Sequence, residues 1–228
     1  MSTLTLVRHG QAEPFQRELS ELTTVGQAQA SKLAEYWLRH GAGFDQVYSG
    51  ELPRQMGTEH IVADAFRSSG QNWPEARRDA AWNEYDASGI FLKRAAKFGI
   101  YQNLQTSREA LREFQRMFEA RMTDWLEGTI AGDGNESWPA FRDRVSGAIR
   151  RIMEGPSSRR VAVFTSGGPI GFAVHFALQA PAKSFLDVNW RVRNGSVSEF
   201  IFDRERFTLD SFNGIPHLME DSALRTWR

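Results

Sequence analysis

The sequence of 228 residues contains no cysteine. A chain without cysteine forms no disulfide, no thiolate metal site and no cysteine nucleophile. A net charge is also missing, because 28 Lys and Arg residues balance 28 Asp and Glu residues. No overall field therefore attracts nucleic acid or a membrane surface. No apolar run reaches the roughly 18 residues that a membrane span needs, and no secretory signal is visible at the N-terminus.

The rest of the composition is that of a globular protein. With 41% hydrophobic residues over this length, the chain is long enough to bury a core of its own. We predict a single cytoplasmic domain over residues 1–228, with no nucleic-acid partner and no membrane partner. The sequence is compatible with a homodimer and does not determine the oligomeric state.

Apolar, strand-like segments alternate with helical patterns along the chain. Strands are predicted at 4–7, 44–49, 77–81, 160–164, 196–202 and 207–212. Helices are predicted at 26–39, 54–66, 107–126 and 137–153, and from about residue 170. This alternation is typical of an α/β fold with a mostly parallel central sheet.

Arg8 and His9 come directly after the first predicted strand, and Gly10 allows a tight turn after them. Ligands of open α/β sheets bind at the carboxyl ends of strands. A guanidinium binds phosphate oxygens in a bidentate manner, and an imidazole nitrogen can attack phosphorus or hold a proton. Taken by themselves, these two residues are better explained as a chance Arg-His pair after a buried strand.

Two further positions suit phosphate chemistry. Arg54 falls in the first turn of the helix after the second strand, where free N–H groups and the helix dipole favour anions. Glu84 lies among aromatic residues in the segment 82–86, and desolvation there would raise its pKa and keep a proton available. Asp86 is the second candidate for this acid, and an exposed loop carboxylate is the alternative interpretation of Glu84.

The string from Leu6 to Gln11, Leu-Val-Arg-His-Gly-Gln, resembles the N-terminal signature of the histidine phosphatase (phosphoglycerate-mutase-like) superfamily. The segments 49–54 and 82–86 are similar to the second and third motifs of that family. The resemblance covers roughly residues 3–86 and 136–218, and it is strongest for the phosphatase branch. It implies a three-layer α/β/α sandwich.

The resemblance also assigns roles to residues. It implies that His9 becomes phosphorylated, that Arg8 and Arg54 clamp the phosphate, and that Glu84 is the general acid. Gln11 is expected to contact the substrate. No metal and no cofactor are needed for this chemistry.

The fourth motif departs from the family. The family has a second histidine in a Ser-His-Gly-Gly string, and this chain has Ser166 there, followed by Gly167 and Gly168. We expect Ser166 and Gly167 to bind phosphate through neutral hydrogen bonds. Replacing a cationic donor by a neutral one is expected to cost about 10²–10³-fold in rate, by analogy with loss of one oxyanion donor.

Residues 89–135 are the least regular part of the pattern. Family members commonly insert helices here, so the resemblance implies a helical cap over the active site, joined to the next helix by a linker at 128–135. Apolar residues recur at three- and four-residue steps within it, at Leu111, Phe114, Phe118, Met122 and Trp125. The alternative is that this stripe packs against the body of the domain.

These residues support three functions. The first is a phosphatase that hydrolyses a small phosphomonoester through a phosphohistidine on His9. The second is a phosphate-binding or regulatory protein in which Ser166 has reduced or abolished catalysis. The third is a serine hydrolase with Ser166, His217 and either Asp187 or Asp210, which is disfavoured because Phe164 stands where a nucleophile elbow needs glycine. A mutase is disfavoured because the loop after Gln11 lacks the longer string of the phosphoglycerate mutases.

Overall fold

A computed structural model describes residues 1–13, 20–86, 108–129 and 136–227. Its centre is a six-stranded sheet in the order β3-β2-β4-β1-β5-β6. The strands are β1 (Ser2–Arg8), β2 (Gln46–Ser49), β3 (Ala76–Arg78), β4 (Arg160–Thr165), β5 (Val197–Phe202) and β6 (Phe207–Gly214). The first four strands of this order pair in parallel, while β5 runs antiparallel to both of its neighbours. The mostly parallel sheet is therefore confirmed.

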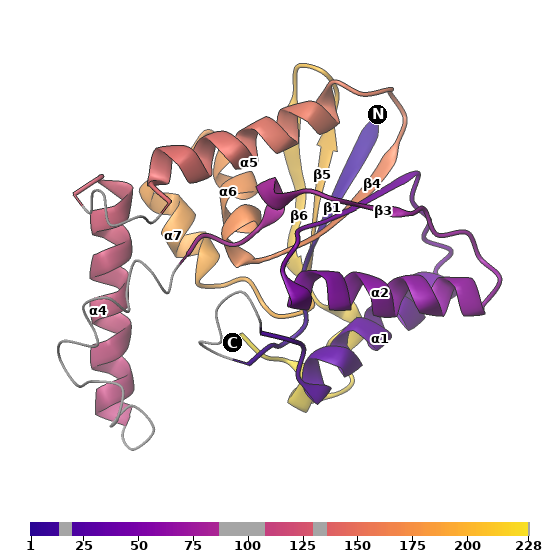
Figure 1. The fold of residues 1–228 in the computed structure, drawn as a ribbon, viewed down its shortest axis with the longest axis horizontal. Helices are drawn as coiled ribbons and strands as arrows, with labels where there is room; N and C mark the ends of the chain where they lie inside the picture. Colours follow the sequence, from indigo (N-terminus) through magenta and orange to yellow (C-terminus); the bar gives the residue numbers. More distant parts are fainter. Residues whose placement is uncertain (14–19, 87–107, 130–135, 228) are drawn as a thin grey trace.

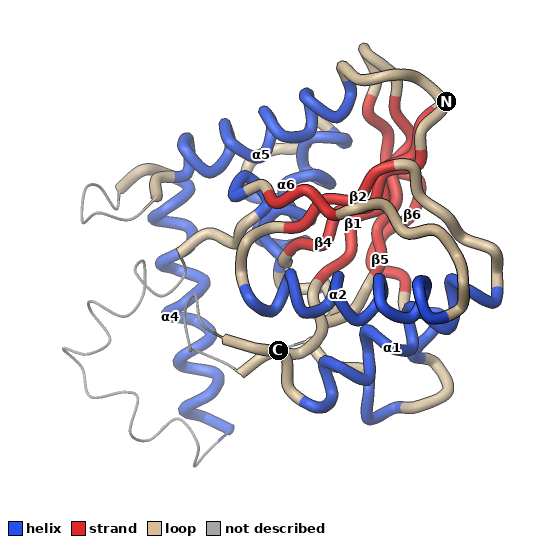
Figure 2. The backbone as a smooth tube through the Cα atoms, turned by 45° about the vertical axis from the view of Figure 1, so that its right-hand side comes forward, coloured by secondary structure: helices blue, strands red, loops and turns tan. Residues whose placement is uncertain are grey.

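Helices cover both faces of this sheet. The α-helices within the described residues are α1 (Thr24–Arg39), α2 (Pro53–Ser68), α4 (Arg108–Leu126), α5 (Trp138–Met153), α6 (Gly167–Leu178) and α7 (Lys183–Asn189). Figures 1 and 2 show α1 and α2 on one side of the strands and α5 and α6 on the other. None of the helices described is both long and apolar enough to cross a membrane.

The side chains of β4 show why the sheet is covered on both faces. Val161 and Val163 belong to the core formed with α5 and α6, whereas Ala162 and Phe164 belong to the core formed with α1 and α2. All four are fully buried. Successive side chains of a strand point to opposite faces, so a strand buried in two cores lies in the middle of a three-layer sandwich. The predicted architecture is confirmed.

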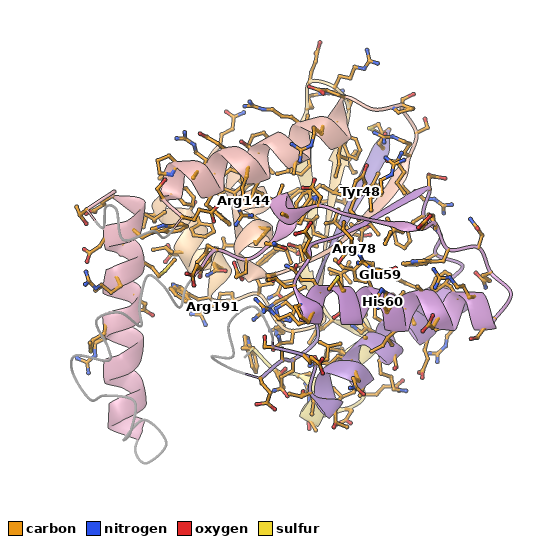
Figure 3. The ribbon with its side chains drawn as sticks, in the orientation of Figure 1. Tyr48, Glu59, His60, Arg78, Arg144 and Arg191 are labelled. Atoms are coloured by element: carbon orange, nitrogen blue, oxygen red, sulfur yellow. The ribbon has the colours of Figure 1, made fainter. Side chains whose placement is uncertain are left out.

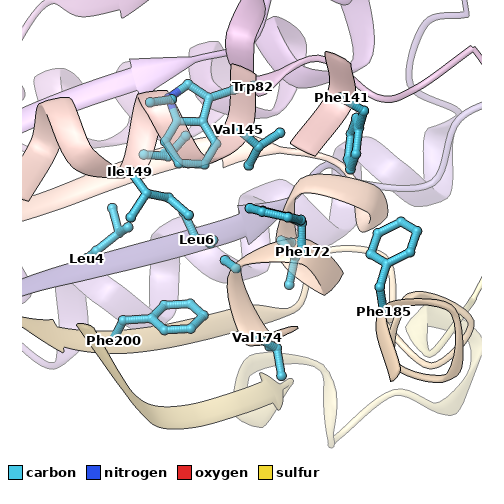
Figure 4. Close-up of a cluster of buried hydrophobic side chains, with 14 of the residues drawn as sticks. Leu4, Leu6, Trp82, Phe141, Val145, Ile149, Phe172, Val174, Phe185 and Phe200 are labelled. Carbon is cyan, nitrogen blue, oxygen red and sulfur yellow. The ribbon is translucent and has the colours of Figure 1, made fainter. Parts of the chain in front are cut away.

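Aromatic side chains fill much of the core beside α5 and α6 (Figure 4). The ring of Trp138 lies 4.9 Å from that of Phe185 and 5.3 Å from that of Trp125. Trp125 and Met122, at the end of α4, are buried here. The end of the predicted apolar stripe therefore packs against the body of the domain. Figure 1 shows the rest of α4 at the edge of the molecule, beside α7.

Three segments differ from the sequence prediction. The strand predicted at 77–81 ends at Arg78, because the Asp79 carboxylate accepts the N–H of Ala81 and caps a 3₁₀ turn at 80–82. Helix α6 begins at Gly167, earlier than predicted. The seven-residue α7 was not predicted, since so short a segment shows little periodicity. The predicted cap and linker lie partly outside the described residues, at 87–107 and 130–135.

Candidate active site

The carboxyl ends of β1 and β4 lie side by side and present the first and fourth motifs at one edge of the sheet. Arg8 is the register partner of Thr165. The backbone of His9 is fixed from both sides, because its N–H donates to Thr165 at 2.9 Å and its carbonyl accepts from Gly195 at 3.1 Å. A Cβ on Gly10 would lie 2.3 Å from the carbonyl oxygen of Gly26, so this turn requires glycine.

The ring of His9 is held at both nitrogens. Nδ1 lies 2.6 Å from the carbonyl oxygen of Gly10, and Nε2 lies 3.2 Å from Nε of Arg54. A carbonyl oxygen only accepts, so Nδ1 carries the proton and Nε2 has the lone pair. Burial, and then the positive charges of Arg54 and Arg8, lower the pKa of His9 well below its usual value. A neutral imidazole with the lone pair on Nε2 is the form that acts as a nucleophile.

Arg54 lies in the first turn of α2, as predicted. Its guanidinium donates to the hydroxyl of Ser20 at 3.0 Å as well as to His9. Thr58 ties this turn to the first motif, because its hydroxyl accepts from the N–H of Gly10 at 3.0 Å and donates to the carbonyl of Arg54 at 2.8 Å. Burial lowers the pKa of Arg54. Helix α2 thus holds a desolvated cation against the imidazole.

Arg8 lies between the start of α6 and the C-terminal segment. Its Nη1 donates to the carbonyl oxygens of Val192 and Trp227, the latter at 3.0 Å. Its Cζ is 3.9 Å from the position of a Cβ built on Gly167. The guanidinium therefore stands beside the first turn of α6, where the positive end of the helix dipole favours an anion.

Glu84 reaches the same helix start. Both of its carboxylate oxygens lie 3.1 Å from the N–H of Gly168. Burial raises the pKa of Glu84, and the Gly168 N–H together with Arg54 and Arg8 opposes that rise. A Cβ on Gly168 would lie 2.0 Å from Oε1 of Glu84, so only glycine admits the carboxylate here. Asp86, the second candidate for the acid, is exposed.

Arg144 on α5 positions the segment that carries Glu84. It donates to the carbonyls of Ala81 and Asn83 at 2.9 and 2.8 Å and is itself paired with Glu136 at 2.8 Å. Figure 3 shows it on the side of α5 that faces this segment. Its role was not predicted from the sequence, although a charged residue beside the apolar face of a helix could have indicated it.

Gln55 is a second positioning residue, and it was not predicted from the sequence. Its side chain is fully buried. Its Nε2 donates to the carbonyl of Trp82 at 3.0 Å and to the hydroxyl of Ser166 at 2.9 Å, and its Oε1 accepts from the N–H of Leu52. It therefore connects the second, third and fourth motifs. Nothing in a linear pattern indicates such a bridge.

The remaining predicted binding residues occupy different places. Ser166 is the N-cap residue of α6, and its buried hydroxyl lies against Gln55. Gly167 follows it in the first helical turn, beside Arg8. The side chain of Gln11 lies against the start of α1, where its Oε1 accepts from the hydroxyl of Thr23 at 2.9 Å.

The serine-hydrolase arrangement does not form. His217 packs against α1, with its ring 6.2 Å from that of Tyr36. Asp187 is on α7, which belongs to the core on the opposite face of the sheet, and Asp210 is exposed on β6. Among the residues described, no three His, Asp or Glu side chains come together as ligands for a metal ion.

Comparison with known proteins gives a consistent result. Residues 4–214 match the family model of the histidine phosphatase superfamily (branch 1). Phosphoglycerate mutase-like protein 4 of Arabidopsis thaliana is 27% identical over 98% of this chain and 90% of its own length. A broad-specificity phosphatase of Saccharomyces cerevisiae is 28% identical over 66% of this chain and 68% of its own. The fold is similar to that of a phosphoserine phosphatase from Entamoeba histolytica, with a TM-score of 0.66 and 17% identity over 96% and 100% of the two chains.

Proposed function

This chain belongs to the histidine phosphatase superfamily, and we propose that it is a phosphatase that hydrolyses a small phosphomonoester through a phosphohistidine on His9. The observation that supports the proposal best is the protonation and orientation of the His9 imidazole. Its Nδ1 proton is held by the carbonyl of Gly10, its Nε2 faces Arg54, and its pKa is lowered. An imidazole so arranged presents a lone pair near neutral pH.

In the first step Nε2 of His9 attacks phosphorus while the bond to the leaving oxygen breaks. Arg8, Arg54 and the positive end of the α6 dipole neutralise the charge on the phosphoryl oxygens. Glu84 gives its proton to the leaving oxygen, so the product departs as a neutral alcohol. The raised pKa of this carboxyl suits it to hold that proton.

In the second step water attacks the phosphohistidine. Glu84, now ionised, takes a proton from the water, the bond between Nε2 and phosphorus breaks, and inorganic phosphate leaves. The enzyme returns to its starting state. Ser166 supplies no positive charge to either step, so we expect turnover to be slower than in a site with a second histidine.

The test is single-turnover phosphate release from 4-nitrophenyl phosphate, with wild type and His9→Ala in parallel and no added metal. A ³²P-labelled substrate adds a second readout, an acid-labile and base-stable phosphoryl group on the protein. We expect release and labelling in the wild type and neither in His9→Ala. The matched control is His40→Ala, at an exposed position just after α1, which should behave as the wild type does.

Two outcomes would overturn the proposal in different ways. Equal release from wild type and His9→Ala would exclude His9 as the nucleophile. No release from either protein, together with a rise in melting temperature on adding inorganic phosphate, would favour a phosphate-binding protein that has lost turnover. The phosphate-binding protein is the second candidate function because Ser166 is neutral where the family has a histidine.

A further inference from the structure

A cavity of about 1210 Å³ lies between α4, α7 and the C-terminal segment. Four cationic side chains line it, Arg116, Lys183, Arg191 and Arg225. They come from positions that are far apart in the sequence, so the cavity is a product of the tertiary fold. Figure 3 shows Arg191 directly after α7, on the side toward α4.

The charge of this cavity differs from that of the whole chain. Against its four cations stand two acidic side chains, Glu119 and Asp187, whereas the chain as a whole has a formal charge of zero. None of the ion pairs among the described residues involves any of these four cations. Unpaired cations that converge on one cavity favour an anionic ligand there.

The cavity adjoins the proposed phosphate clamp. Trp227 lines the cavity, and its carbonyl accepts a hydrogen bond from Arg8 at 3.0 Å. Val192, the neighbour of the cavity residue Arg191, accepts another from the same guanidinium. A phosphoryl group held at Arg8 and His9 would therefore lie close to the cavity.

The wall formed by the C-terminal segment is firmly held. Nε2 of the buried Gln29 donates to the carbonyl of Leu224 at 2.7 Å and to the hydroxyl of Thr226 at 3.0 Å. That hydroxyl in turn donates to Asn194 at 3.0 Å. The backbone of Arg225 is thereby placed between two tethered residues, which fixes where its side chain enters the cavity wall.

We propose that this cavity binds an acidic group, carboxylate or phosphate, on the leaving group of the substrate, and that Arg191 and Arg225 recognise it. The inference rests on the proposed function for the position of the transferred phosphoryl group. It adds a substrate class to that function: phosphomonoesters whose alcohol carries a second negative charge. Specificity is then decided outside the residues that perform the chemistry.

The test compares kcat/KM for three esters. Glycerol 3-phosphate has a neutral leaving group, 3-phosphoglycerate carries a carboxylate, and propane-1,3-diyl bisphosphate carries a second phosphate. We expect the wild type to prefer at least one acidic ester by about tenfold or more, since two partly exposed ion pairs supply roughly that factor. Which ester is preferred distinguishes the two acidic groups. The preference should shrink as salt is added.

The variants are Arg191→Gln, Arg225→Gln and the double variant. We expect the double variant to lose most of the preference while its kcat/KM for glycerol 3-phosphate changes by less than about threefold. The matched control is Arg204→Gln, at an exposed position in the turn between β5 and β6, which should keep the preference. Melting temperatures of all variants show whether they are folded.

Two results separate this inference from the proposed function. Equal kcat/KM for the three esters in wild type and double variant would overturn the inference and leave the phosphatase intact. If no ester is turned over, calorimetric binding of 3-phosphoglycerate and of the bisphosphate is measured instead. Binding of one of them that is about tenfold weaker in the double variant would support the cavity without the phosphatase, whereas equal or absent binding would overturn the cavity too.

Discussion

Two titratable side chains at the proposed site, His9 and Glu84, have pKa values displaced in opposite directions. Burial together with Arg54 and Arg8 lowers the pKa of His9, and burial raises that of Glu84. The two shifts favour a neutral imidazole together with a protonated carboxyl. The pH profile of kcat/KM should have an acid limb set by His9 and an alkaline limb set by Glu84.

Replacing Glu84 by Gln should lower kcat/KM more for substrates with a poor leaving group than for substrates with a good one. The amide keeps an oxygen to accept from Gly168 but has no proton to give at the required pKa. We expect kcat/KM for 4-nitrophenyl phosphate to fall by less than about tenfold, and that for an alkyl phosphate by about 10²–10⁴-fold. The alkaline limb should also disappear from the alkyl-phosphate profile. Asp86→Asn, at the exposed neighbouring acid, is the control, and equal losses on both esters would contradict the assignment of Glu84 as the acid.

At the scale of elements, the starts of helices place several groups of this site. Helix α2 begins with Pro53 and brings Arg54 onto His9, while α6 begins at Gly167 and brings a free N–H onto Glu84. Helix α5 contributes from outside through Arg144, which holds the carbonyls just before Glu84. The geometry of the site therefore depends on how these three helices are positioned relative to the edge of the sheet.

The start of α6 gives a prediction with a matched control. In Gly168→Ala the new methyl group would lie 2.0 Å from the Glu84 carboxylate and 2.7 Å from the ring of Tyr85. We expect kcat for an alkyl phosphate to fall by about 10²-fold, because displacing a catalytic group by about 1 Å has that effect. In Gly147→Ala, within α5, the nearest atom to the methyl group is 3.5 Å away on the side chain of Arg151. That variant should keep its activity and be as stable or more stable, and comparable losses of activity in both variants would show that Gly168 has no special role.

At the scale of the whole molecule, the sheet separates two large cores, and a smaller cluster joins the C-terminal part of the chain to α1. This cluster contains Ile215, Leu218 and Leu224 packed against Val25 and Ala28. His217 is buried beside it, and burial lowers its pKa to about 4. Because the same segment ends at the wall of the cationic cavity, its stability bears on the proposed substrate site.

The buried His217 predicts a loss of stability in mild acid. An unfolded histidine has a pKa of about 6.5. Between about pH 6.5 and 4, His217 is therefore protonated in the unfolded state and neutral in the folded state. The free energy of unfolding therefore falls as the pH is lowered through this range, by up to about 3 kcal/mol from this residue. Urea unfolding at about pH 7 and pH 4.5 should show a smaller drop in His217→Gln than in wild type. His40→Gln should keep the full drop, and the idea fails if His217→Gln keeps it as well.

Much of the fold and part of the site are predictable because they depend on local sequence. Alternating apolar residues specify a strand, and the residues just after a strand lie at its carboxyl end, so local pattern alone places Arg8, His9 and Arg54 at the edge of the sheet. Glu84 was identified as a candidate from its resemblance to a family motif. Its contact with the start of α6 is known only from the tertiary structure. The cytoplasmic location, the single domain and the cap over 89–135 remain predictions. So do the roles of the site residues in catalysis and phosphate binding, namely those of Arg8, His9, Gln11, Arg54, Glu84, Ser166 and Gly167.

The sequence by itself determined the order of the strands and of the longer helices, and the residues that follow β1 and β2, because hydrophobic periodicity and turn chemistry act over a few neighbouring positions. The tertiary structure alone decided which distant groups meet. The bridge of Gln55 to Ser166 and the hold of Arg144 on the Glu84 segment join residues that are far apart in the chain. The cationic cavity likewise gathers side chains from separate elements. Which distant residues come into contact depends on how the helices pack across the sheet. That packing produces no periodic pattern in the sequence.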